Sequence, residues 1–141
     1  MTRRSVLRLV DANANRALEG LRVCEEIVRF SCDWPNGFRR ARALRHAVAS
    51  ALTRLPIGAH ALLRARASGR DVGRRAPSSH VDSLERLLLI NFQRAKESLR
   101  VLEECARLVA PRHTIAFQSL RFRTYEVERD LLLGLAALRH H

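Results

Sequence analysis

Apolar residues recur every three or four positions through most of the chain, which is the spacing of a helix with one buried face. On a helical wheel Ala17, Leu21, Cys24 and Val28 share a face, and charged residues occupy the opposite one. Leu, Ala, Arg and Glu dominate the composition, whereas β-branched and aromatic residues are few. The pattern predicts an all-α protein, and 141 residues suffice for one domain.

Turn and capping residues divide this pattern into elements. Asp11 is the expected N-cap of the first helix, and Asp82 with Glu85 loosely fits a capping box at the start of the third long helix. The stretch 67–80 is rich in Gly, Pro and Ser and is the one long loop that we expect. We predict a bundle of four long helices and a short one, over residues 11–31, 37–55, 57–66 (the short one), 81–109 and 114–138.

One helical segment occurs twice. Residues 13–29 return as residues 91–107, displaced by 78 positions, with 10 of 17 aligned residues identical and most of these polar. The helix that follows each copy echoes its counterpart, Leu44-Arg45-His46 against Leu120-Arg121-Phe122. We therefore predict an internal duplication with pseudo-twofold symmetry, its halves at about 11–55 and 81–138.

Four of the repeated residues, Asn13, Arg16, Asn91 and Arg94, fall within or beside the apolar faces of their helices. A half-buried arginine cannot lose its charge, and leaving one unpaired would cost about 3–5 kcal/mol. Two interpretations stay open. The arginines form an Arg–Glu clamp between the two halves, or they line a polar pocket that binds phosphate through the bidentate guanidinium fork.

The other charges have plainer interpretations. Glu19, Arg22 and Glu26 share the polar face and are spaced for surface ion pairs, worth about 0.2–0.5 kcal/mol each. The net charge of +12 comes from 25 arginines and one lysine interleaved with Glu, without a basic tail, so nucleic-acid binding is disfavoured. Asp71, in an Asp-Val-Gly triplet, either holds a magnesium ion or belongs to a turn.

Several functional classes lack their signatures. The chain has no GxxxxGK[ST] phosphate loop, no GxGxxG after a strand, no HExxH and no EF-hand loop. The start of the chain does not read as a signal peptide, and no apolar run reaches 18 residues. We therefore expect a cytoplasmic protein that does not span a membrane.

At residues 10–23 the sequence Val-Asp-Ala-Asn-Ala-Asn-Arg-Ala-Leu-Glu-Gly-Leu-Arg-Val resembles the opening signature of the monofunctional hydroxymethylpyrimidine phosphate kinase family of thiamin biosynthesis. That family includes the domain fused N-terminally to thiamin-phosphate synthase in some bacteria. The Asp-Val-Gly triplet at 71–73, the second helical signature at 91–104 and the closing Leu120-Arg121-Phe122 extend the resemblance over nearly the full length.

The resemblance implies a kinase that uses ATP and Mg²⁺ to convert the pyrimidine phosphate to its diphosphate. It implies that Arg16 and Arg94 act as catalytic residues that grip phosphate oxygens, and that Asp71 and Asp11 hold magnesium. The substrate would be bound by three further pairs, of which the glutamates either fix the arginines or reach the pyrimidine amine: Asn13 and Asn91, Glu19 and Glu97, and Arg22 and Arg100.

Two alternatives remain beside the kinase. One is a non-catalytic helical module that docks on thiamin-phosphate synthase or forms a homodimer, which would show an exposed apolar stripe on the last helix at Leu131, Leu132, Leu133, Leu135 and Leu138. The other is an Arg-rich nucleic-acid-binding protein, whose affinity would fall steeply with salt.

Overall fold

The computed structural model describes residues 2–74 and 79–139. This part of the chain is helical and contains no strand, so the predicted all-α class is confirmed. Short 3₁₀ turns at Ser68–Arg70 and Pro111–His113 join some of the elements. The five α-helices are α1 (Arg3–Ser31), α2 (Pro35–Arg54), α3 (Ala59–Ala65), α4 (Leu84–Val109) and α5 (Thr114–Arg139).

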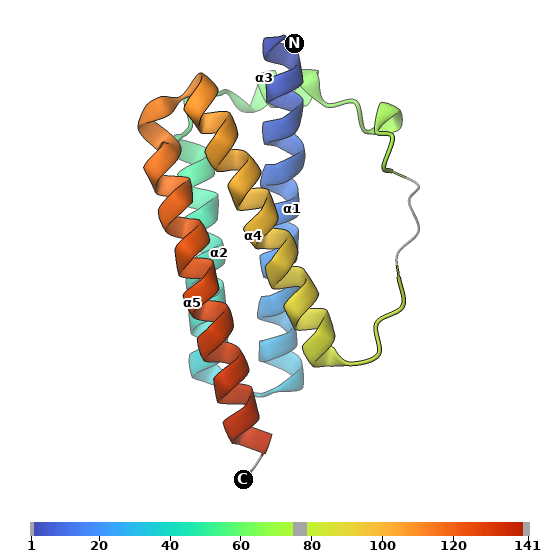
Figure 1. The fold of residues 1–141 in the computed structure, drawn as a ribbon, viewed down its shortest axis with the longest axis vertical. Coiled ribbons are helices and arrows are strands. Elements are labelled where there is room, and N and C mark those ends of the chain that lie inside the picture. Colours follow the sequence, from blue (N-terminus) through green and yellow to red (C-terminus); the bar gives the residue numbers. More distant parts are fainter. Residues whose placement is uncertain (1, 75–78, 140–141) are drawn as a thin grey trace.

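The four long helices form an antiparallel bundle (Figure 1). α1 packs against α2, α3 and α4, and α5 closes the bundle against α2 and α4. α1 and α4 run in opposite directions and approach closely at Gly20, where a Cβ atom would lie 2.9 Å from the backbone oxygen of Asn91. Fully buried side chains fill the interior, among them Leu21, Leu44, Phe92, Leu99 and Phe117.

The first helix begins earlier than predicted. Thr2, not Asp11, is its N-cap, and the Thr2 hydroxyl accepts a hydrogen bond from the Ser5 backbone N–H at 3.2 Å. Val6 and Val10 are buried, so the added turns extend the apolar face of α1. Asp11 therefore lies inside the helix, and its predicted capping role was wrong.

The start of α4 also differs from the prediction. Ser83 is the N-cap, and its hydroxyl accepts a hydrogen bond from the Arg86 backbone N–H at 3.1 Å. The capping box predicted from Asp82 was therefore wrong by one residue. Of the predicted loop 67–80, residues 75–78 lie outside the described part of the chain. The ends of α2 and α5 agree with the prediction to within two residues.

A buried ion pair joins α4 to α5. The Lys96 ammonium lies 2.8 Å from a carboxylate oxygen of Glu128 and 4.3 Å from the centre of the Tyr125 ring. Lys96 is only 8% exposed. A buried ammonium needs such partners because burial without them would remove its hydration uncompensated.

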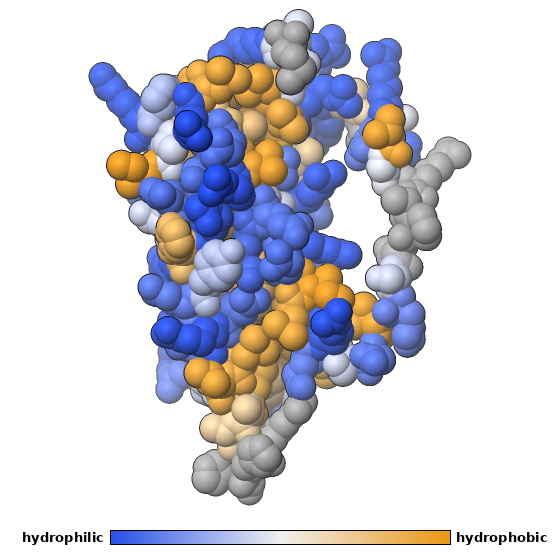
Figure 2. Space-filling view, in the orientation of Figure 1, coloured by the Kyte–Doolittle hydropathy of each residue, from blue (hydrophilic) through white to orange (hydrophobic). Residues whose placement is uncertain are grey.

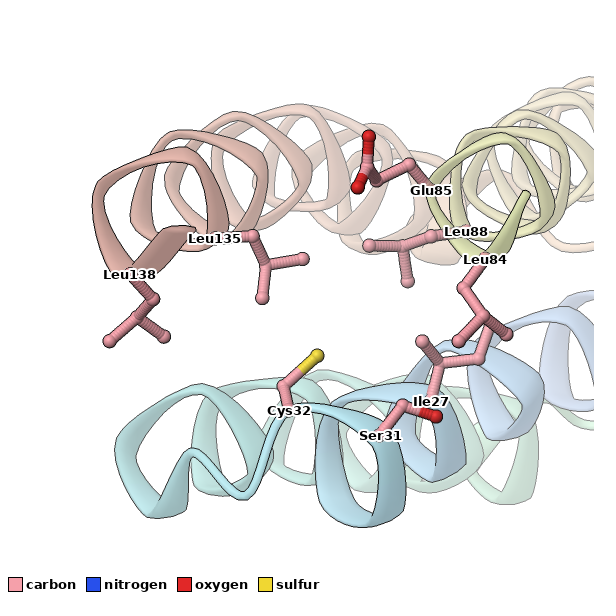
Figure 3. A pocket seen from close by; sticks show the side chains of 8 residues that line it. All are labelled: Ile27, Ser31, Cys32, Leu84, Glu85, Leu88, Leu135 and Leu138. Carbon is pink, nitrogen blue, oxygen red and sulfur yellow. The ribbon is translucent and has the colours of Figure 1, made fainter. Parts of the chain in front are cut away.

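An apolar hollow of about 280 Å³ lies where the ends of α1 and α5 meet the start of α4 (Figure 3). Leucine side chains from α4 and α5 surround it, and the Cys32 sulfur is turned toward it. Apolar surface gathers at the same end of the molecule (Figure 2). The stripe expected on α5 is interrupted, however, because Leu131 is buried whereas Leu133 is 64% exposed.

Within residues 2–74 and 79–139, no helix is both long enough and apolar enough to cross a membrane.

Candidate functional site

A polar cleft of about 600 Å³ lies between α1 and α4. Each helix contributes five lining residues, and every lining residue of α1 has its counterpart 78 positions later on α4. Four of the five pairs are identical. The pairs are Asn13 and Asn91, Arg16 and Arg94, Glu19 and Glu97, Gly20 and Ser98, and Val23 and Val101. The structure thus brings together six of the predicted site residues, while a duplication as the origin of the two halves stays a prediction.

The two asparagines lie at the floor of this cleft, each 5% exposed. Asn13 Nδ2 donates to the Leu9 carbonyl and Asn91 Nδ2 to the Leu87 carbonyl, both at 2.9 Å. A carbonyl can only accept, so these bonds fix the orientation of each amide. Each Oδ1 accepts nothing from the described residues and is the atom available to a ligand donor.

The two arginines lie at the rim and are exposed, not half-buried as expected. An extended guanidinium reaches past the apolar face to solvent, which a wheel position does not reveal. Neither Arg16 nor Arg94 forms an ion pair with any residue that the structure describes. The clamp interpretation therefore does not hold for these two residues. Two guanidinium groups without ion-pair partners thus line the cleft, together with the carboxylates of Glu19 and Glu97.

The glutamates of the cleft differ from each other in their contacts. Glu97 accepts a hydrogen bond from Gln93 Nε2 at 3.0 Å, whereas Glu19 has no partner among the described residues. Glu19 also makes no pair with Arg22, so that part of the predicted surface pairing is absent. A ligand with hydrogen-bond donors would therefore find at least one carboxylate free.

Arg22 and Arg100 are not among the lining residues of the cleft. Arg22 Nε lies 3.0 Å from Glu26, which confirms that predicted surface pair, and Arg100 Nε lies 3.4 Å from Glu104. Their side chains are 55% and 56% exposed. Their predicted substrate-binding role gains no support from this position.

Two buried ion pairs went unpredicted. Glu25 and Glu103 are 1% and 5% exposed, and each carboxylate lies 3.1 Å from an arginine Nε, that of Arg45 and that of Arg121 respectively. Both arginines belong to the Leu-Arg dipeptide that recurs in the helix after each copy of the repeat. That recurrence, together with the recurrence of the glutamate in the repeat itself, could have indicated the pairs from sequence. The pairs tie α1 to α2 and α4 to α5 in the same way, which holds both walls of the cleft.

A second hollow, of about 660 Å³, adjoins the cleft and shares Asn13, Arg16 and Glu19 with it. Its outer side is formed by the connection that leaves α3 on the side of α1 (Figure 1). Arg66 anchors this connection by donating two hydrogen bonds of 2.7 Å to the Asp11 carboxylate. Asp71 lines the same hollow.

The carboxylates of this hollow differ in their fitness for magnesium. Asp71 Oδ1 accepts the Gly73 N–H at 2.9 Å, which is the turn interpretation, and its second oxygen is unengaged. Magnesium is commonly held by one or two carboxylates together with substrate phosphates, so Asp71 fits. Asp11 has both oxygens engaged by Arg66 and does not fit while that pair stands. Among the described residues no three acidic, His or Cys side chains form a metal cluster.

Comparisons with known proteins extend over the whole bundle. Residues 8–130 match the ThiD2 family. The chain is 37% identical over 144 residues to a thiamine-phosphate synthase of Gloeobacter violaceus, covering 95% of this chain and 40% of that protein. It is 33% identical over 138 residues to the thiamine-phosphate synthase of Rhodopirellula baltica, covering 96% of this chain and 36% of that protein. The chain thus spans 40% or less of the length of these relatives. No solved structure matches it.

Proposed function

Because the chain belongs to the ThiD2 family, we propose that it is a kinase of thiamine biosynthesis that transfers a phosphoryl group from ATP to hydroxymethylpyrimidine phosphate. The observation that carries the proposal is the paired cleft, which is lined by two unpaired guanidinium groups and by the accessible amide oxygens of two buried asparagines. Anionic phosphates complement the first pair, and the exocyclic amine of an aminopyrimidine complements the second.

The reaction makes modest chemical demands on the protein. A phosphate oxygen of the acceptor forms a bond to the terminal phosphorus of ATP, while the bond from that phosphorus to the bridging oxygen breaks and ADP leaves. The attacking oxygen is already anionic, so no strong base is needed. Catalysis of this kind rests on positioning and charge neutralisation. Arg16 and Arg94 supply both by donating to phosphate oxygens.

The remaining groups orient the substrates. Asn13 and Asn91 accept from the pyrimidine amine through Oδ1, and the free carboxylate of Glu19 offers a further acceptor. Asp71 is the residue that would hold magnesium, through its unengaged carboxylate oxygen. When bound, the ion neutralises phosphate charge and polarises the bond that breaks. Since the donor is ATP, we place the reaction in the cytoplasm.

A non-catalytic role remains the second candidate. The relatives named thiamine-phosphate synthase are more than twice as long as the matched region, so a domain of this kind also occurs within a larger protein. In that role the bundle would dock on a thiamin-phosphate synthase and turn over no ATP.

The deciding experiment is an assay with ATP, Mg²⁺ and hydroxymethylpyrimidine phosphate. We expect the diphosphate to form, and we expect Arg16→Met and Arg94→Met each to lower kcat about 100-fold or more, as removal of a charge-stabilising donor does. Arg42→Met is the matched control, because Arg42 is an exposed arginine of α2 outside the cleft. Circular dichroism should show equal helix content in all variants.

Two results would overturn the kinase. Unchanged kinetics in both cleft variants would remove the cleft as the site. Absence of turnover in the wild-type chain, with saturable binding to a thiamin-phosphate synthase, would favour the docking module. Binding to DNA or RNA that weakens steeply with salt would instead favour the nucleic-acid alternative.

A further inference from the structure

We infer that the two adjoining hollows divide the substrates between them. The hollow beside Arg66 takes the polyphosphate of the nucleotide, the α4 side of the cleft takes the pyrimidine phosphate, and Arg16 stands between them. This inference rests on the proposed kinase function and assigns its two substrates to places.

The two walls of the paired cleft are nearly equivalent. Five matched pairs offer nearly the same groups on both walls, so the pairs alone cannot distinguish a donor from an acceptor. Phosphoryl transfer between two different molecules needs them held in one order. Whatever breaks the equivalence of the walls therefore decides which substrate lies where.

The first break is the connection after α3. Arg66 anchors this connection to α1 by donating two hydrogen bonds to the Asp11 carboxylate. The counterpart of Asp11 on α4 is Leu89, whose side chain cannot accept a hydrogen bond. The second hollow consequently exists on the α1 side, and its described lining includes no residue of α4. An elongated ligand can extend from the cleft in this direction.

The second break is Ser98. Ser98 is only 4% exposed, and its hydroxyl has no hydrogen-bond partner among the described residues. The hydroxyl oxygen nevertheless keeps some contact with solvent. The hydroxyl is therefore open to the cleft. Its counterpart Gly20 has no side chain and so offers no such group. A side chain would not fit there, since a Cβ would lie 2.9 Å from the Asn91 carbonyl oxygen. Only the α4 wall presents this extra hydrogen-bonding group.

Charge indicates which ligand suits which side. The second hollow is lined by three arginines, Arg8, Arg16 and Arg66, and by three carboxylates, Asp11, Glu19 and Asp71. Arg66 and Asp11 pair with each other, so Arg8 and Arg16 remain without an ion-pair partner in the described chain. Together with Asp71 as a metal ligand they suit a magnesium-bound polyphosphate. The α4 wall carries one guanidinium, that of Arg94, with the Glu97 carboxylate, the Ser98 hydroxyl and the Asn91 amide oxygen. That set suits a small ligand with a single phosphate.

The test compares Michaelis constants for the two substrates in three variants. Arg8→Met should raise the KM for ATP about tenfold and leave that for the pyrimidine phosphate unchanged, since a charge-assisted hydrogen bond is lost on one side only. Ser98→Ala should do the reverse by several-fold. Arg86→Met is the matched control. Arg86 occupies the position of Arg8 in the second half, lies outside both hollows and should change neither constant.

Each outcome decides something. If turnover occurs but Arg8→Met and Ser98→Ala affect the same substrate or the opposite ones, the assignment is wrong and the kinase stands. If turnover is absent, calorimetric titration with a non-hydrolysable ATP analogue and Mg²⁺, and separately with the pyrimidine phosphate, replaces kinetics. Binding of both ligands with the same selective losses would support the assignment, and binding of neither would end both proposals.

Discussion

Lys96 shows how strongly burial selects a side chain at the scale of one residue. The chain uses arginine at 25 of its 26 cationic positions and lysine only here. An ammonium is compact and can meet one carboxylate while its stem packs, whereas a guanidinium presents five donors on a planar fork. Between α4 and α5 the partners are Glu128 and the Tyr125 ring, which satisfy a point charge.

Lys96→Met should therefore be costly. It leaves the Glu128 carboxylate, only 13% exposed, without its partner, and breaking a buried pair costs about 3–5 kcal/mol. Urea denaturation measures the loss. The double variant Lys96→Met with Glu128→Gln should recover most of it. Arg129→Met breaks an exposed, solvent-screened pair with Asp130 and should cost far less than Lys96→Met. Equal losses in Lys96→Met and Arg129→Met would contradict this interpretation.

Asp130 predicts a specific dependence on pH. Hydrogen bonds from Arg40, and then from Arg129, lower the pKa of Asp130 in the folded state below its ordinary value. Stability from these contacts is fully present above the ordinary carboxyl pKa and is lost as the pH falls through the folded pKa. Asp130→Asn should thus lower Tm at pH 7, and the difference from wild type should shrink in acid. A difference that grows in acid would be the wrong sign.

At the scale of elements, the periodicity of the sequence predicted which face of a helix each residue occupies. A 3.6-residue repeat fixes which residues share a face, so Asn13 and Asn91 could be placed inward from sequence. The start of α1 was missed because Asp11 is itself a preferred N-cap residue, and a capping residue does not show whether the helix has already begun before it. The Asp11–Arg66 contact spans 55 residues and depends on the path of the chain after α3, which no local pattern encodes.

The candidate site followed the same division. The pairs that line the cleft could be found because identical residues recur at a fixed spacing. Ser98 could not, because it differs from its counterpart Gly20 and identity was the signal. The exposure of Arg16 and Arg94 could not be predicted either, since the exposure of a long side chain depends on the neighbouring helix and not only on its wheel position.

The close approach of α1 to α4 makes Gly20 a sensitive position. Gly20→Ala would place a Cβ atom 2.9 Å from a backbone oxygen, so the two helices must shift, at a cost of about 1–3 kcal/mol. That exceeds the gain of about 0.5–1 kcal/mol expected from alanine in a helix. Gly69→Ala is the control, because a Cβ there would meet no atom closer than 3.9 Å and no glycine of the described chain has a positive φ, so alanine fits and restricts the unfolded chain. Chemical denaturation of both variants should give opposite signs.

At the scale of the whole molecule, the cleft holds two guanidinium groups that pair with no described residue, beside two carboxylates, in a chain of net charge +12. The bundle holds two guanidinium groups at one rim through helices that are themselves braced by buried ion pairs. The two guanidinium groups can bind an anion but contribute no ion pair to the stability of the fold. Their effects on function and on stability can therefore be separated by experiment.

Pyrophosphate should therefore stabilise the wild-type protein. At a hundredfold excess over Kd, binding to the folded state contributes about 2.7 kcal/mol, which raises Tm by about 5–10 °C. Arg16→Met and Arg94→Met should melt within about 2 °C of wild type without ligand, since neither removes an ion pair, and should lose most of the pyrophosphate shift. Arg42→Met should keep it. A shift that survives in both cleft variants would place the anion elsewhere.

The single lysine also gives the molecule a built-in reporter of its own opening. An endoproteinase that cuts only after lysine has one target in this chain, and that target lies in the middle of α4, closed off by α5. Cleavage needs α4 to leave α5 and to unwind around Lys96, because a protease binds its target in an extended form. The cleavage rate under native conditions therefore measures how often this local unfolding occurs. One cut yields two fragments, and the rate at which they appear measures the rate of opening of α4.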